Sequence, residues 1–268
     1  MERSDVAKSQ PAVPIHGQAA FDGMRRAGKL AAEILDLIED HVRPGATTGE
    51  LDRLMHDAIE RAGASPAPLG YRGFPKATCI SLNHVVCHGI PGDRKLKDGD
   101  ILNIDVTVIL DGWHGDSSRM YFAGRPAMKA KRLCRVTFES LWKGIEQVRP
   151  GATLGDVGHA IQRHAEGHRC GVVRDYCGHG IGRVFHDAPS VLHYGKPGEG
   201  MALEPGMIFT IEPMINLGTF ETKLLSDGWT VVTKDRQLSA QFEHTVGVTD
   251  DGCEVFTLSP AGRHHPAW

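Results

Sequence analysis

The chain has 268 residues, of which 41% are hydrophobic and 24% are charged; this is ordinary for a globular protein and allows one large domain or two. Its formal net charge of −3 gives no reason to expect a nucleic-acid partner or a membrane-surface partner. There is no apolar run of about 18 residues and no signal-peptide pattern near the start, so we expect no membrane span. Six cysteines without a C-x-x-C pair favour reduced thiols and a cytoplasmic location.

Residues 1–17 mix charges, prolines and polar groups, and we expect a disordered arm there, ahead of one folded domain over residues 18–268. Apolar residues at helical spacing predict a helix over residues 22–41, which ends before Pro44 and Gly45. A second helix is predicted from Thr48 to Gly63, with Thr48 as its N-cap.

The same order of helix, Pro-Gly and helix recurs over residues 131–148 and 153–167. Strand patterns cover residues 78–90, 101–122, 207–217 and 229–248. The order of elements excludes the alternating pattern of a Rossmann fold. We therefore predict an α+β fold in which two helix pairs pack on a curved, largely antiparallel sheet that spans both halves.

Two internal matches indicate that the halves are related. Residues 96–106, LKDGDILNIDV, and residues 203–213, LEPGMIFTIEP, share L-x-x-G-x-I-x-x-I-[DE], which aligns Asp105 with Glu212 at an offset of 107. VRPGATTGEL and VRPGATLGDV match at an offset of 106. Carboxylates that such a symmetry brings together repel one another unless a cation lies between them. The repeat therefore predicts a metal site at the pseudo-symmetry axis.

The strand at residues 101–110 has one wholly apolar face, while Asp105 and Thr107 lie on the other. Asp111-Gly112 is a hairpin signal, and a two-residue loop would pair Asp105 with Ser118 and Thr107 with Asp116. Asp105 and Asp116 would then be diagonal neighbours on one face, with Cβ atoms roughly 7 Å apart, a gap that a metal ion can bridge.

Glu212 and Glu243 project in the same way from the polar faces of otherwise apolar strands. Three histidines, His88, His179 and His186, lie in VCHGIP, YCGHGIG and VFHDAP, next to or near glycines that let the backbone approach a small site. The H-E-x-x-H, G-x-S-x-G and Walker A motifs are absent. Oxygen ligands with one or two histidines suit Mn, Fe(II) or Co better than a structural zinc. Two such ions would activate a water for hydrolysis.

The chain closely resembles the type I methionine aminopeptidases, which have the pita-bread fold. The resemblance runs from about residue 20 to residue 260 and rests on five strings in order: GYRGFPKATCISLNHVVCHGIP, LKDGDILNIDVTVILDGWHGDSSRMY, YCGHGIGRVFHDAP, GMIFTIEPM and DGWTVVTKDRQLSAQFEHT. It implies a single catalytic pita-bread domain over residues 18–268. It also implies two divalent metal ions, Co, Mn or Fe(II), with Zn and Ni as further candidates.

The resemblance also implies roles for particular residues. Asp105 would chelate one ion, His179 and Glu212 would hold the other, and Asp116 and Glu243 would bridge both. His88 and His186 would contact the substrate, and Glu243 would also accept a proton. The methionine pocket would be formed by Tyr71, Phe74, Cys79, Phe185 and Trp229.

The activity implied is removal of the initiator methionine from nascent polypeptides whose second residue is small. The expected setting is a cytoplasmic monomer near the ribosome, with no specific nucleic-acid partner and no membrane. The alternative is a Xaa-Pro aminopeptidase or dipeptidase of the same fold. Those enzymes share the metal ligands but usually carry an added N-terminal domain, and their substrate pockets match these aromatic strings less well.

Overall fold

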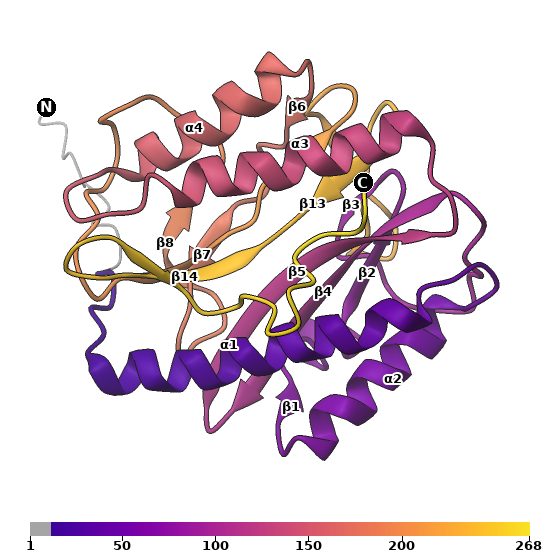
Figure 1. Cartoon of the computed structure of the whole chain (residues 1–268), viewed down its shortest axis with the longest axis horizontal. Helices are drawn as coiled ribbons and strands as arrows, with labels where there is room; N and C mark the ends of the chain where they lie inside the picture. Colours follow the sequence, from indigo (N-terminus) through magenta and orange to yellow (C-terminus); the bar gives the residue numbers. More distant parts are fainter. Residues whose placement is uncertain (1–11) are drawn as a thin grey trace, which may run out of the picture.

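Two helix pairs, one from each half of the chain, enclose a set of antiparallel strands (Figure 1). The computed structural model describes residues 12–268. The helices are α1 (Gln18–Ile38), η1 (Glu39–His41), α2 (Thr48–Arg61), η2 (Tyr71–Gly73), α3 (Met128–Ile145) and α4 (Leu154–Gly167). The strands are β1 (Ser65–Pro66), β2 (Cys79–Leu82), β3 (Val85–Cys87), β4 (Asp100–Leu110), β5 (Trp113–Ala123), β6 (Gly171–Val172), β7 (Gly178–Gly180), β8 (Asp187–Val191), β9 (Ile208–Ile211), β10 (Met214–Asn216), β11 (Thr222–Leu224), β12 (Val231–Thr233), β13 (Ser239–Gln241), β14 (His244–Val248) and β15 (Cys253–Val255).

The repeated sequence forms the same helix start in each half. The Thr47 hydroxyl accepts a hydrogen bond from the Glu50 N–H at 3.1 Å, and the Glu50 carboxylate accepts one from the Thr47 N–H at 2.8 Å. This reciprocal pair is a capping box, and Thr153 with Asp156 forms its counterpart at the start of α4. The prediction of Thr48 as the N-cap was therefore wrong by one residue, because the hydroxyl of Thr47 meets the free backbone N–H.

The strands form four antiparallel sheets rather than the one continuous sheet that was expected. The β4–β5 hairpin pairs along its full length, with Asp111 and Gly112 at its tip in left-handed conformations. Strand β9 ends before Glu212 because Pro213 has no N–H to donate to a neighbouring strand. An isolated bridge between Ser118 and Glu243 connects the hairpin to the strands of the second half.

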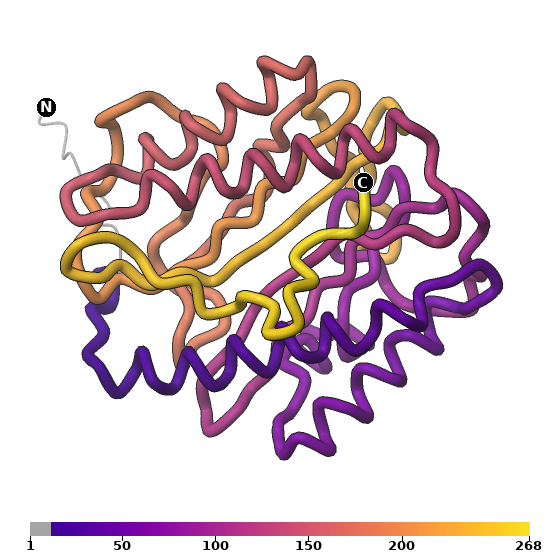
Figure 2. Tube along the Cα trace, viewed as in Figure 1, coloured from indigo at the N-terminus to yellow at the C-terminus, as the bar shows by residue number. Residues whose placement is uncertain are grey.

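Each half has its own apolar core. The first lies between α1, α2 and β4, and includes Leu35, Met55 and Ile104. The second lies between α3, α4, β9 and β14, and includes Leu133 and Phe209. Figure 2 shows the C-terminal segment in yellow running between the two helix pairs. The residues that alternate with apolar side chains in or beside the strands, such as Asp105 and Glu243, face the opposite way and line one cavity.

Residues 1–11 of the expected arm lie outside the described residues. Residues 12–17 form no helix or strand, and the His16 N–H donates a hydrogen bond to the Gly206 carbonyl at 2.8 Å. Among the described helices, none combines the length and apolar character needed to cross a bilayer.

Candidate metal centre

One cavity of about 340 Å³ is lined by every residue that the sequence assigned to the site. These twelve residues come from both halves of the chain: Tyr71, Phe74, Cys79, His88, Asp105, Asp116, His179, Phe185, His186, Glu212, Trp229 and Glu243. The acidic groups and the aromatic groups thus share one space.

The β4–β5 hairpin places the first two carboxylates. Asp105 pairs with Ser118 and Thr107 pairs with Asp116, which confirms the register expected from the two-residue loop. The Thr107 hydroxyl donates a hydrogen bond to Asp116 Oδ1 at 2.7 Å and fixes the orientation of that carboxylate. Its other oxygen, Oδ2, lies 3.6 Å from His179 Nε2.

Glu212 follows β9 and is held by three neighbours. The Thr210 hydroxyl donates to its Oε1 at 2.9 Å, and the Gln241 amide donates to its Oε2 at 3.2 Å. The backbone N–H of Glu212 donates to His193 Nε2 at 3.1 Å. His179 Nε2 lies 3.7 Å from Glu212 Oε1, so this imidazole faces two of the four carboxylates.

Glu243 lies between β13 and β14, where its backbone is fixed against the hairpin. Its N–H donates to the Ser118 carbonyl at 3.0 Å, and the Ser117 hydroxyl donates to its own carbonyl at 2.7 Å. Ligand atoms of Asp116, His179 and Glu243 all lie within 4.8 Å of one another.

Burial dominates the electrostatics of these groups. It raises the pKa of Asp116 to about 7, and it raises the pKa of Asp105 well above the usual value, with the charge of Asp116 adding to the effect. The pKa values of Glu212 and Glu243 are also raised, first by burial and then by Asp116. Burial lowers the pKa of His179 to about 4, so its imidazole is neutral at neutral pH and free to bind a metal ion.

These groups fit divalent ions. Four buried carboxylates repel one another, and within residues 12–268 no lysine or arginine forms an ion pair with any of them. Ions bound between the carboxylates would remove that repulsion, and a neutral imidazole adds a nitrogen ligand. The donor set therefore suits two divalent metal ions.

Two further histidines line the cavity without joining the acidic cluster. His88 adopts a left-handed backbone conformation (φ 54°), and burial lowers its pKa. His186 Nδ1 hydrogen-bonds the Tyr71 hydroxyl at 3.0 Å, and burial together with His179 lowers its pKa to about 3. Both imidazoles are therefore neutral hydrogen-bonding groups at neutral pH.

Aromatic side chains form the apolar wall of the cavity. The Phe74 and Trp229 rings meet edge to face at 5.1 Å between centroids, and the Tyr71 and Phe185 rings lie 4.9 Å apart. Cys79 is buried and pairs with Asp105 across β2 and β4, so the wall adjoins the acidic cluster.

Some residues at the site were not predicted. Arg72, Tyr176 and Met214 also line the cavity. Tyr176 lies directly before the CGHGIG string and could have been singled out with His179. His193, which orients Glu212, gave no sequence signal, because it is a lone buried histidine outside every motif.

The sequence model of a protein family described as "Metallopeptidase family M24" matches residues 22–250 of the chain. The chain belongs to this family and is a metal-dependent hydrolase. Two relatives of high identity are named methionine aminopeptidases. The methionine aminopeptidase of Rickettsia prowazekii (strain Madrid E) is 62% identical over 96% of this chain and 99% of its own length. The methionine aminopeptidase of Escherichia coli (strain K12) is 56% identical over 92% of this chain and 94% of its own length.

Solved structures agree with this placement and confirm the pita-bread α+β fold. The R. prowazekii methionine aminopeptidase superposes with a TM-score of 0.92 and covers 92% of this chain and 100% of its own. The Thermotoga maritima methionine aminopeptidase is 39% identical, with a TM-score of 0.90 and coverage of 92% and 99%. A prolidase from Pyrococcus horikoshii OT3 is 19% identical, with a TM-score of 0.70, and shares the fold alone. The aminopeptidase function is therefore better supported than the Xaa-Pro alternative.

Proposed function

We propose that this chain removes the initiator methionine from nascent polypeptides whose second residue is small. One observation carries the proposal: a buried acidic cluster that suits two metal ions and an aromatic wall that suits an unbranched thioether line the same cavity of about 340 Å³. Relatives named methionine aminopeptidase, 56–62% identical to this chain, support it.

The proposed ligands follow the cluster. Asp105 would chelate one ion, His179 and Glu212 would hold the other, and Asp116 and Glu243 would bridge them. When bound, the ions would lower the pKa of a water and polarise the scissile carbonyl. The oxygen-rich donor set favours Mn, Fe(II) or Co as the native metal, with Zn and Ni as further candidates.

The other residues would bind and orient the peptide. Glu243 would accept a proton beside the reacting centre. His88, neutral because of its burial, would donate a hydrogen bond at the scissile bond as charge develops. His186, which Tyr71 orients, would contact the peptide from the segment that leads into β8. A free α-amine would be required near Asp105.

We infer that the first side chain of the peptide lies against Tyr71, Phe74, Cys79, Phe185 and Trp229. A charged first residue would be rejected because it would find no partner there. Norleucine should be accepted more weakly than methionine, since a small apolar change is worth only about 1–3 kcal/mol. The second residue would have to be small because it passes beside His88.

The expected setting is the cytoplasm, in keeping with six free cysteines, and a monomer that works near the ribosome with no nucleic-acid or membrane partner. Where initiation uses formyl-methionine, the formyl group would be removed first, because a free amine is needed.

A tripeptide panel tests the proposal. We expect cleavage of Met-Ala-Ser by the metal-loaded chain and little cleavage of Lys-Ala-Ser or Met-Lys-Ser. Chelation should abolish cleavage, and Mn, Co or Fe(II) should restore it. Equal turnover of Lys-Ala-Ser and Met-Ala-Ser would refute the pocket assignment, and preferred cleavage of Ala-Pro peptides would establish the Xaa-Pro alternative.

A further inference from the structure

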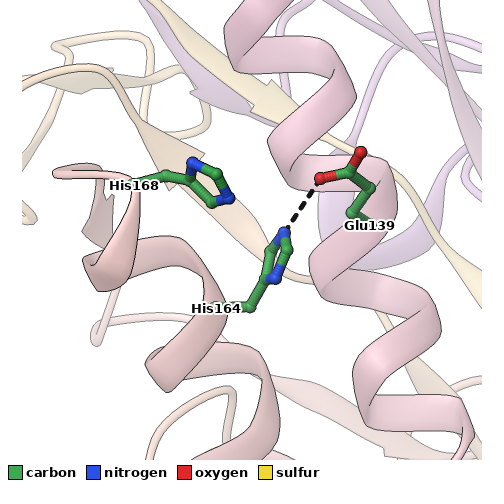
Figure 3. Close-up of side chains that lie close together, drawn as sticks. All are labelled: Glu139, His164 and His168. Atoms are coloured by element: carbon green, nitrogen blue, oxygen red, sulfur yellow. Dashed lines mark hydrogen bonds and ion pairs between the residues drawn. The ribbon is translucent and has the colours of Figure 1, made fainter.

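A second group of metal-ligating side chains lies between α3 and α4, apart from the catalytic cavity (Figure 3). Glu139 comes from α3, His164 from the last turn of α4, and His168 is the residue that ends α4. We propose that these three side chains bind one divalent transition-metal ion of the Zn²⁺ class and link the two helices.

The three side chains are already close together. His164 Nε2 lies 3.0 Å from Glu139 Oε2, the contact drawn as a dashed line in Figure 3. The rings of His164 and His168 have centroids 4.8 Å apart, because residues four apart lie on one side of a helix. One ligand atom from each residue lies within 4.8 Å of the other two.

This spacing is near what a metal ion needs. Ligand atoms about 2.1 Å from a tetrahedral ion lie roughly 3.4 Å from one another. The Glu139–His164 pair, at 3.0 Å, is near this distance, and His168 is not buried, so its ring can rotate to close the rest. Two imidazoles and one carboxylate favour Zn²⁺, Ni²⁺ or Cu²⁺ over Mg²⁺ or Ca²⁺.

The surroundings leave room for the ion and its water. His164 and His168 line an open hollow of about 590 Å³, which shares no residue with the lining of the catalytic cavity. The site lies at the carboxyl end of α4, where the helix dipole favours a cation. Arg135 lies 3.9 Å from Glu139 Oε1, which leaves Oε2 to face His164.

Binding would replace a hydrogen bond by two metal–ligand bonds. In the unbound state His164 Nε2 and Glu139 Oε2 share a hydrogen bond of 3.0 Å. The ion would bind both atoms together with His168, and the neutral His164 ring would then carry its proton on Nδ1. Because the ligands come from two helices, the bound ion would hold α3 against α4. This site is independent of the proposed peptidase function.

Counting bound metal tests the proposal. The metal-loaded protein is dialysed against micromolar Zn²⁺, and total divalent metal per chain is measured for the wild type, His164→Gln and Glu139→Gln. We expect each variant to bind one ion fewer than the wild type while it retains full turnover of Met-Ala-Ser, which also shows that it has folded.

His56→Gln is the matched control. His56 and Glu60 form a similar pair on α2, with His56 Nε2 3.4 Å from Glu60 Oε1, but they belong to no group of three ligands among the described residues. This variant should bind as many ions as the wild type. Equal metal content in the wild type and His164→Gln, or an equal loss in His56→Gln, would overturn the proposal. If His164→Gln does not fold, the metal content of His168→Asn provides the same test, and a metal content equal to that of the wild type would overturn the proposal.

Discussion

Among the four cavity carboxylates, Asp116 acts on all the others, since its charge raises the pKa of Asp105, Glu212 and Glu243. It also faces His179 at 3.6 Å. A carboxylate in this position is the one that two ions can share, so its charge should matter more than that of any single neighbour.

Asp116→Asn should therefore abolish metal binding and activity with little change in shape, because the amide oxygen can still accept the Thr107 hydrogen bond. Losses of about 10- to 100-fold follow removal of groups that only support a ligand, and a direct ligand should cost at least that much. Metal content and tripeptide turnover measure the effect.

Asp111→Asn is the control in the same hairpin. Asp111 is exposed and has φ 52°, a conformation that asparagine adopts readily. This variant should keep both metal and activity. Retention of two ions in Asp116→Asn would show that Asp116 bridges nothing.

His88→Asn tests a residue that should act on the peptide and not on the metal. Asparagine tolerates the left-handed backbone of His88, so the fold should persist. We expect unchanged metal content and a fall in turnover of about 100-fold, as for other donors that meet developing charge. Loss of an ion from this variant would mean that His88 is a ligand.

The carboxylates of the site were predictable because parity decides which side chains share a strand face, whereas the aromatic pocket and the roles of the histidines came only from the family resemblance. Alternation along the hairpin, counted from its Asp-Gly turn, is enough to place Asp105 beside Asp116, and the observed register agrees. Parity could not find His193 or Tyr176, whose places depend on how separate loops pack.

At the scale of elements, the helices were predictable and the sheets were less so. Four helices follow from apolar spacing and Pro-Gly ends, with boundaries moved by a few residues. Strands such as β6 and β7 have only two or three residues, too few for a periodic pattern. The division into four sheets depends on breaks between strands, such as that at Glu212 and Pro213 between β9 and β10, which the alternation of side chains does not reveal.

The helix N-caps give predictions for both lower and higher stability. Thr47→Ala and Thr153→Ala should each lower the free energy of unfolding by about 1 kcal/mol, because each leaves an N–H of the first turn unpaired. Ala127 caps α3 without a side-chain hydrogen bond and is exposed, so Ala127→Asp should stabilise the protein. Urea unfolding measures all three, and no difference between the threonine variants and wild type would show that tertiary packing alone fixes these helix starts.

At the scale of the whole molecule, strands that pack on two apolar cores bring four carboxylates together in one cavity. The packing of these cores must therefore overcome the repulsion between the four carboxylates, which only protons or metal ions can remove. Metal removal should consequently weaken the whole fold and not the site alone, and the effect should depend on pH.

The sign of that dependence follows from the raised pKa values. Above about pH 7.5 the buried histidines, such as His193 with a pKa of about 3, are largely neutral in both the folded and unfolded states. In the chelated protein the folded state still binds protons on Asp116, with a pKa of about 7, while the unfolded chain does not. The pKa values of Asp105, Glu212 and Glu243 are also raised. Stability should thus fall as pH rises above about 7.5, with each such group contributing at most about 1.4 kcal/mol per pH unit.

Thermal unfolding of chelated and metal-loaded protein across that range checks the expectation. The melting temperature of the chelated form should fall with pH, while that of the loaded form stays nearly level, because ions replace the protons and remain bound. Chelated Asp116→Asn should show a shallower fall than the chelated wild type, since one of the repelling charges is gone. Parallel curves for the chelated and loaded forms would mean that the carboxylates are not held together by the fold, and that the two cores do not bear the repulsion between them.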